Sequence, residues 1–473
     1  MMKFMKKIIQ EQFDVLVIGG GPAGLMAAGR AAQKGARVAL VEKNDRYGIK
    51  LLMSGNGRCN VTQDADDMFE FVKAYKNGRF LLSAFNRMSP SNLRDFFRKL
   101  GVETKVEKNG KVFPVSDQGK DVLDALYQYC RKNMVTFFNT EEVIDICFEG
   151  ELNSPDGSST PKTLGKITKI ITKKKEISAE KYILATGGKS YPHTGSTGKA
   201  FDWLSKLGHK IVEPQPSLVP IMIREQAIKD AQGLSAHNVS ATVMQAGKKI
   251  ATLSGDLMFA HYGLSGPLAL NLSRDIMCVI AREAKNLKNL KQCDMGTQIL
   301  TSHCYAPQEY IVLKLFLDLK PELSFAQVDE IIRKDFEENG HKNLSNCLQD
   351  FASPKMLDLI FALSEIDTHK HTSKLSKQER LKITTLFKKM EMTVEGLFGF
   401  EKAMVTSGGV SVKEIDSKTM QSKIVENLYF AGEIIDVDGP TGGYNLQVCW
   451  ATGYVAGENA ALNLRLKIRE YSF

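Results

Sequence analysis

The stretch "FDVLVIGGGPAGLMAAGRAAQKGARVALVEK", residues 13–43, decides the fold. Residues 15–18 form a continuous apolar run, which is typical of a strand buried on both faces of a parallel sheet. The Ala/Leu/Met-rich residues 23–33 predict a helix, and Gly35 closes it before a second strand in "RVALVEK". The sequence therefore predicts a strand, a glycine turn, a helix and a second strand, which together make a βαβ unit.

The turn carries Gly19, Gly21 and Gly24 in the spacing Gly-x-Gly-x-x-Gly. Such glycines allow backbone to approach a pyrophosphate, whose charge rests on the amides of the helix N-terminus. Glu42 ends the second strand, where a carboxylate accepts hydrogen bonds from an adenosine ribose and disfavours a 2′-phosphorylated nucleotide. We predict that the cofactor-binding residues here are Gly19, Gly21, Pro22, Ala23, Gly24, Glu42 and Lys43.

Length and charge limit the classes of protein. A chain of 473 residues with 43% hydrophobic residues is too long for one ordinary core, so we expect two or three domains, with insertions allowed. The net charge is +9, but the lysines are spread out or sit in short runs such as 173–175. This pattern predicts a solvated basic surface and disfavours a nucleic-acid partner.

The cysteines and the N-terminal residues indicate a cytoplasmic protein. Eight cysteines are scattered, and none forms a C-x-x-C pair, which argues against a zinc ribbon, another metal site or a redox dithiol. "MMKFMKKIIQEQ" lacks a compact apolar core and a cleavage site, so we expect no signal peptide. No apolar run reaches the roughly 20 residues that span a bilayer, so we expect no membrane contact.

The predicted secondary structure changes several times along the remainder of the chain. Residues 89–133 predict two helices around a hairpin at Asn109-Gly110, and 150–165 predict a polar surface loop. Residues 210–270 alternate short β-like runs with Gly and Pro, which is typical of a barrel or sandwich, and 321–392 predict three helices. The predicted domains are a first cofactor-domain segment at 1–205, a β-barrel-like insertion at 206–318, a helical subdomain at 319–392, a return strand at 393–402 and a second cofactor-domain segment at 403–473.

A second polar cluster, "GIKLLMSGNGRCNVT", spans residues 48–62. Its glycines imply unusual backbone, and Arg58 can offset phosphate charge with a fork of donors. Cys59 suggests redox chemistry, but without a neighbouring cysteine a small buried packing residue is the better interpretation. The predicted cofactor contacts are Lys50, Ser54, Gly55, Gly57, Arg58, Cys59 and Asn60.

Two further motifs place glycines after buried strands. "KYILATGGKSYPHTGSTG" (181–198) fits close approach to a flat or anionic group, although a plain glycine-rich loop remains an alternative. "GEIIDVDGPTGGYNLQ" (432–447) leads into an Ala/Gly-rich helix, whose N-terminus suits an anion or negative charge on a ring. The predicted contacts are Thr186, Gly187, Gly188, Gly432, Glu433, Gly442, Gly443, Tyr444, Asn445 and Leu446.

Together with "HYGLSGP", these motifs resemble the BaiN/aminoacetone-oxidase-like family of FAD-dependent oxidoreductases, also called YhiN-like flavoproteins. The resemblance implies an α/β fold: a Rossmann-type FAD domain of the two-dinucleotide-binding kind, split by a β-barrel domain with a small helical domain. It implies that residues 19–24 and Glu42 hold the ADP half. Arg58 and its loop, residues 186–188 and residues 432–433 would line the middle, and the "GGYNLQ" turn would lie against the pyrimidine edge of the flavin. Glu433 stands where many relatives have Asp.

The resemblance also suggests the chemistry, since members reduce bile-acid enones or oxidise aminoacetone. Our leading hypothesis is reduction of an activated C=C bond of a small molecule by NADH or NADPH through FAD, with hydride passing from N5 to the β-carbon. A single complete Gly-x-Gly-x-x-Gly predicts that the nicotinamide visits only transiently. The acid that protonates the α-carbon would be His261, Tyr191 or Tyr444, each of which also fits a structural role.

Two alternatives stay open at this point. One is an FAD-dependent amine or aminoketone oxidase that uses O₂. The other is an RNA-associated or non-catalytic flavoprotein in which FAD is mainly structural. Neither the substrate nor the oligomeric state follows from the sequence.

Overall fold

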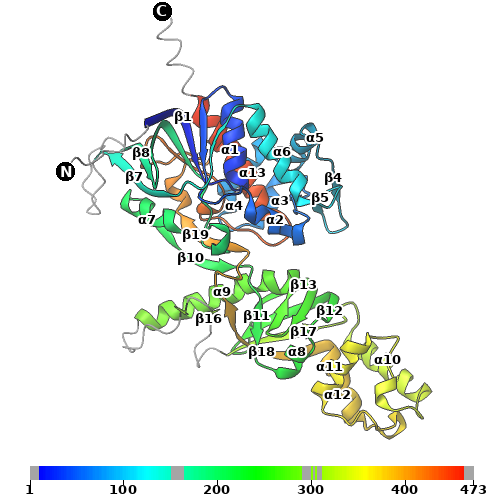
Figure 1. The fold of residues 1–473 in the computed structure, drawn as a ribbon. Coiled ribbons are helices and arrows are strands. Elements are labelled where there is room, and N and C mark those ends of the chain that lie inside the picture. The colour runs from blue at the N-terminus through cyan, green and yellow to red at the C-terminus, as the bar shows by residue number, and fades with distance from the viewer. Residues whose placement is uncertain (1–9, 151–164, 290–299, 302–303, 306–311, 463–473) are drawn as a thin grey trace, which may run out of the picture. The chain divides into compact units, whose positions relative to one another are not determined.

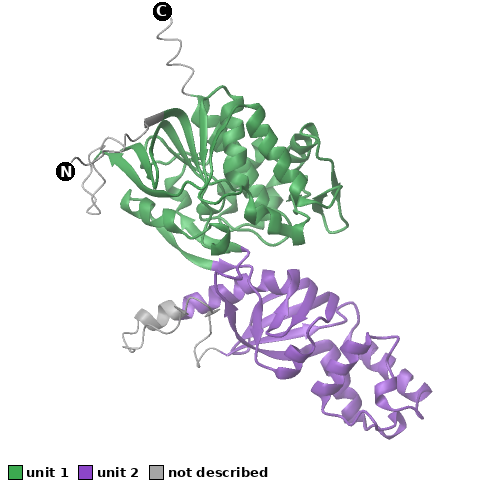
Figure 2. Ribbon diagram, viewed as in Figure 1, with its two compact units in different colours: residues 1–215, 405–473 green, residues 216–404 purple. Residues whose placement is uncertain are grey.

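The fold is that of a computed structural model, which describes residues 10–150, 165–289, 300–301, 304–305 and 312–462. The chain divides into two compact units, residues 1–215 with 405–473 and residues 216–404 (Figure 2). Both divisions fall later than the predicted boundaries after residues 205 and 402. Strand β10 (Ile211–Ser217) pairs with β19 (Val405–Val410), so the first unit extends past residue 205 into β10 and resumes only where β19 begins.

A largely parallel sheet forms the centre of the first unit, with the order β6-β2-β1-β9-β8-β7 and β20 also pairing with β9 (Figure 1). Ile18 of β1 lies beside Val41 of β2 and Leu184 of β9, so the segments after these three strands leave the same edge. The strands are β1 (Gln10–Ile18), β2 (Val38–Val41), β6 (Thr136–Phe138), β7 (Val143–Glu149), β8 (Lys166–Thr172), β9 (Glu176–Leu184) and β20 (Leu428–Phe430).

Helices α1 (Pro22–Gln33) and α13 (Tyr444–Leu462) pack closely against each other. A Cβ on Gly453 would lie 2.5 Å from the carbonyl oxygen of Ala23, and one on Gly457 would lie 2.3 Å from that of Ala27. The contact therefore needs glycine. The other helices of this unit are α2 (Ile49–Met53), α3 (Met68–Lys73), α4 (Gly78–Arg87), α5 (Pro90–Lys99), α6 (Gly119–Lys132) and α7 (Lys199–Lys206).

The predicted βαβ unit and the hairpin are confirmed. Strands β4 (Thr104–Val106) and β5 (Lys111–Pro114) flank Asn109-Gly110, and β3 (Thr62–Gln63) joins β5. The predicted loop 150–165 falls almost wholly on residues 151–164, outside the described part of the chain, as do Cys293 and the first nine residues.

The second unit contains a closed barrel of six strands, as predicted from its alternating β-like runs. The ring runs β11-β14-β13-β12-β17-β18 and closes because β18 pairs back with β11. Its strands are β11 (Ile221–Ile223), β12 (Ser235–Gln245), β13 (Lys248–Ala260), β14 (Gly263–Ser265), β17 (Leu313–Asp318) and β18 (Met390–Phe398), with β15 (Leu300–Thr301) and β16 (Cys304–Tyr305) extending the sheet beyond β18.

The β-like interpretation was wrong beyond residue 265, where α9 (Gly266–Asn289) begins. Pro267 suits a first helical turn, and Leu268, Leu272 and Ile276 recur every fourth residue and are buried in the core of this unit. The apolar run was read as strand because short runs do not distinguish the two periods.

The three predicted helices are confirmed as α10 (Phe325–Glu338), α11 (Pro354–Ser364) and α12 (Lys377–Lys389). Ser324 and Ser376 each cap a helix in a capping box, with Gln327 and Glu379 as partners. These helices, the short helix α8 (Gln226–Asp230) and the barrel contribute to one hydrophobic core.

Candidate functional site

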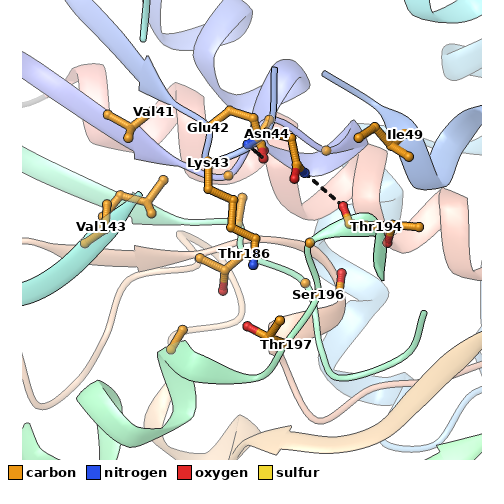
Figure 3. A pocket seen from close by; sticks show the side chains of 18 of the residues that line it. Val41, Glu42, Lys43, Asn44, Ile49, Val143, Thr186, Thr194, Ser196 and Thr197 are labelled. Atoms are coloured by element: carbon orange, nitrogen blue, oxygen red, sulfur yellow. Dashed lines mark hydrogen bonds between the residues drawn. The ribbon is translucent and has the colours of Figure 1, made fainter. Parts of the chain in front are cut away.

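A cavity of about 880 Å³, counted with its open mouth, lies at the edge of the sheet where β1, β2 and β9 end (Figure 3). Its walls include residues 18–22, 41–44, 141–143, 185–187 and 194–200. The first glycine turn, the strand-end carboxylate and the "ATGG" motif thus face one space.

The glycine turn leaves this space free of side chains. Gly19 has φ +107°, and a Cβ there would lie 2.4 Å from the carbonyl oxygen of Ala185. A Cβ on Gly24 would lie 1.8 Å from the carbonyl oxygen of Gly19, whereas one on Gly21 would meet no described atom within 4 Å. Gly21 and Pro22 line the cavity, so the N-terminus of α1 faces it.

Glu42 fixes the turn from the end of β2. Its Oε2 accepts a hydrogen bond of 2.7 Å from the amide of Gly20, and its Oε1 accepts one of 2.9 Å from the amide of Asn44. The side-chain amide of Asn44 donates to the carbonyl oxygen of Thr194 at 3.0 Å. The predicted ribose acceptor is therefore held in a defined orientation at the cavity wall.

Two polar groups in the cavity fit a phosphate-bearing cofactor. Thr186 Oγ1 is buried and has no hydrogen-bond partner among the described residues. Lys43 points into the cavity, toward the wall that carries Thr186 and Ser196 (Figure 3). Burial lowers the pKa of Lys43, although Glu42 and Glu142 oppose this shift. With the open glycine turn, these groups match the pyrophosphate and ribose of FAD.

The predicted role of Arg58 is not supported by its contacts. Its guanidinium pairs with Glu107 and Asp117, each at 2.6 Å from Nη2, and lies 3.9 Å from the ring centre of Phe113. Its charge is already balanced by two carboxylates, which makes it a poor phosphate ligand. The unusual backbone expected nearby is present, since Gly55 has φ +58°.

Cys59 and its neighbours likewise stand apart from the cavity wall. The wall takes residues 48–50 from this motif but not residues 54–60. Burial raises the pKa of Cys59 to about 12, so the thiol stays protonated. This favours the packing role over a redox role. Asn60 is buried, and its Oδ1 has no partner among the described side chains and backbone.

Glu433 is the centre of a partly buried polar network. Lys50 Nζ lies 2.6 Å from Glu433 Oε2, while Ser190 Oγ and the amide of Thr406 donate to Oε1 at 2.5 and 2.7 Å. Burial acts to raise the pKa of Glu433, but Lys50, Ser190 and Thr406 together hold it below the ordinary value. Ser190 and Thr406 were missed by sequence reasoning, because nothing in the sequence pairs positions so far apart.

The "GGYNLQ" turn is a rigid scaffold. Asn445 uses its whole amide on the turn: Oδ1 accepts from the amide of Gly439 at 2.9 Å, and Nδ2 donates to the carbonyl oxygens of Gly439 and Pro440. A Cβ on Gly443 would lie 2.4 Å from the backbone carbon of Thr62. Asn445 therefore shapes this turn through its side chain.

Residues 75–77 also contact this segment, and no sequence motif predicted these contacts. Tyr75 donates to the carbonyl oxygen of Tyr444 at 3.0 Å, and Asn77 to that of Asp436 at 2.7 Å. Lys76 Nζ lies 2.8 Å from Asp436 Oδ1. The loop 436–444 is thus preformed by contacts with the first part of the chain.

The three candidate acids have different surroundings. Tyr444 stacks on Phe71 at 5.1 Å, and burial raises the pKa of its hydroxyl, which indicates a packing role. Tyr191 has φ +49° in the loop that leads to the cavity wall. His261 is exposed between β13 and β14, in the second unit rather than in the unit of the two tyrosines.

The fold and the cavity define an FAD-dependent oxidoreductase built on a Rossmann-type domain. The model of the HI0933-like protein Rossmann domain matches residues 13–459, and the chain belongs to this family.

Relatives and a solved structure cover nearly the whole chain. It is 28% identical to the "3-dehydro-bile acid delta(4,6)-reductase" of Clostridium scindens, over 94% of this chain and 98% of that protein. It is 26% identical to the "Ribosomal RNA dihydrouridine synthase" of Escherichia coli, over 95% and 98%. The 3-ketosteroid delta1-dehydrogenase from Sterolibacterium denitrificans has a similar fold, with a TM-score of 0.50 and 12% identity over 96% of this chain and 100% of that one.

Across the described ranges, none of the helices is both long and apolar enough to cross a membrane. The same residues contain no group of three His, Cys, Asp or Glu side chains arranged to hold a metal ion.

Proposed function

We propose that the protein reduces a C=C bond conjugated with a carbonyl group, taking electrons from NADH or NADPH through FAD. The observation that carries this proposal is that two full-length relatives with different names are named for compounds that share one type of bond. A 3-keto steroid with unsaturation at positions 4 and 6 and the uracil ring of uridine both contain such a bond. The preformed nucleotide cavity of the first unit supports the cofactor side of the proposal.

The protein's own residues would divide the work. When bound, FAD supplies a hydride at N5. Residues 19–24 and Thr186 would hold the pyrophosphate, and Glu42 the ribose. Lys50 and Glu433 would bring a fixed charge pair to the middle of the cofactor. Tyr191 or His261 would give a proton to the α-carbon, which completes the addition of hydrogen.

A small enone is our first substrate class, and uridine in RNA is the second. The RNA class is favoured by the relatives of that name in Escherichia coli and Haemophilus influenzae, each 26% identical to this chain. Residues 166–210 also contain ten lysines and three acidic residues. Several of these lysines are paired, such as Lys173 and Lys199 with Glu142, so the charge available to RNA is smaller than the composition suggests.

Anaerobic turnover with two acceptors separates these classes. The holoenzyme is supplied with NADH or NADPH and either a 3-keto-4,6-diene steroid or unmodified ribosomal RNA, and the products are identified by mass. A gain of two hydrogens in one acceptor assigns the class. Bleaching of the flavin only by an amine or aminoketone, with no gain in either acceptor, would overturn the proposal in favour of the oxidase. Absence of both bleaching and product would overturn both.

A further inference from the structure

A buried carboxylate that no motif predicted lines the cavity beside Glu42. Glu141 lies between β6 and β7, and its backbone amide donates to the carbonyl oxygen of Glu42 at 2.9 Å. The two glutamates therefore occupy adjoining parts of one wall. With Glu42 holding the ribose, as proposed above, the adjoining wall lies at the nucleoside end of the site.

The hydrogen bonds of Glu141 are incomplete. The residue is only 4% exposed, and its Oε1 is buried without a partner among the described residues. Lys174 Nζ approaches the other oxygen, Oε2, at 3.6 Å. A buried carboxylate oxygen with no donor is costly, and such atoms in a binding cavity point to a donor supplied by the ligand.

We propose that Glu141 accepts a hydrogen bond from the exocyclic amino group of adenine and so selects an adenine dinucleotide. Adenine presents an N–H donor at position 6, whereas hypoxanthine and guanine present a carbonyl oxygen there. A carboxylate attracts the first and repels the second, and a buried acceptor left unpaired discriminates strongly. This inference rests on the FAD placement proposed above, with the ribose at Glu42, and not on the proposed reaction.

The test compares FAD with deaminated FAD, in which hypoxanthine replaces adenine. Apoprotein is titrated with each, and dissociation constants are taken from quenching of flavin fluorescence. The wild type should bind FAD at least about tenfold more tightly, as expected when a charged hydrogen bond is lost. Equal affinity of the wild type for the two nucleotides would overturn the proposal without any variant.

Two substitutions probe the acceptor. Glu141→Met removes it at similar volume and should weaken FAD about tenfold while leaving deaminated FAD unchanged or tighter. Glu141→Gln offers an N–H to hypoxanthine and should bring the two affinities within about threefold. Asp145→Asn, an exposed carboxylate on β7, should change nothing. A wild-type preference retained in both Glu141 variants would overturn the assignment, and an equal loss for both nucleotides would place the donor on the ribose instead.

Discussion

At the scale of single residues, one glycine of the nucleotide turn is needed for cofactor binding and another for folding. Gly21 adopts extended backbone with φ −77° and ψ −176°, which other residues also adopt. Its missing side chain would project into open space, whereas that of Gly24 would collide with the carbonyl oxygen of Gly19. Two glycines of one motif therefore serve different purposes.

We expect Gly21→Val to fold normally and to lose FAD, because its side chain would occupy the space of the pyrophosphate. Gly24→Val should instead lower the thermal stability of the apoprotein, since the backbone must shift to admit it. Flavin content after purification and the melting temperature distinguish the two. Full flavin occupancy in Gly21→Val would show that the cofactor lies elsewhere.

Glu433→Gln should destabilise the protein by about 1–3 kcal/mol, because it leaves the partly buried ammonium of Lys50 without its carboxylate partner. Urea unfolding of the apoprotein measures the change. Glu426→Gln, at an exposed position close in sequence, is the control. Equal midpoints for the two variants would mean that the network around Glu433 contributes no net stability.

At the scale of elements, Glu458 of α13 joins two other helices. Its Oε1 pairs with Arg30 of α1 and with Lys34, the residue after α1, the latter at 2.9 Å, and its Oε2 pairs with Arg87 of α4 at 2.6 Å. Burial acts to raise the pKa of Glu458, but Lys34 and Arg30 hold it below the ordinary value of 4.5. The carboxylate therefore favours the folded state while it is ionised.

This gives a prediction for acid stability. The pKa of Glu458 is lower in the folded state than in the unfolded chain. Its contribution to the free energy of unfolding is therefore fully present above pH 4.5 and is lost as the pH falls through the folded-state pKa. Glu458→Gln should thus be less stable than the wild type near neutral pH, and the difference should shrink below about pH 4. Unfolding free energies measured from pH 3 to 7 check this, and a constant difference would contradict it.

Among the helices and strands, those with local sequence signals could be predicted from the sequence and the others could not. The βαβ unit, the hairpin at Asn109-Gly110 and the capped helices carry local signals, and each was predicted. Helix α9 was missed because its first turn continues an apolar β-like run. The Glu433 network was missed because Ser190 and Thr406 come together only through the tertiary fold. The ion pairs of Arg58 with Glu107 and Asp117, 49 and 59 residues away, were not anticipated for the same reason.

At the scale of the whole molecule, the cofactor unit is assembled from both ends of the chain. Trp450 donates to the carbonyl oxygen of Val61 at 2.8 Å, and Gln447 accepts from Thr62 at 2.7 Å. These contacts join α13 to the segment that follows the nucleotide turn. The two glycine-rich motifs therefore belong to one unit, although about 400 residues separate them.

We expect the first unit to fold without the second, because β10 and β19, at which the chain leaves and returns, pair with each other. Replacing residues 216–404 by a short Gly-Ser linker should leave FAD affinity within about threefold of the wild type. Turnover should fall to background if His261 is the acid. Fluorescence titration and anaerobic assays measure the two, with His261→Ala in the full chain as the comparison. A deletion variant that folds yet binds no FAD would contradict this account.

The central claim is that reduced flavin in this protein passes its electrons to a C=C bond conjugated with a carbonyl. The most direct measurement is the flavin absorbance of the holoenzyme after reduction by NADH or NADPH without oxygen, followed as a 3-keto-4,6-diene steroid or uridine-containing ribosomal RNA is added. Return of the oxidised flavin spectrum, with one acceptor reduced per flavin, is the predicted result. A flavin that stays reduced with both acceptors and is reoxidised only by O₂ would contradict the claim.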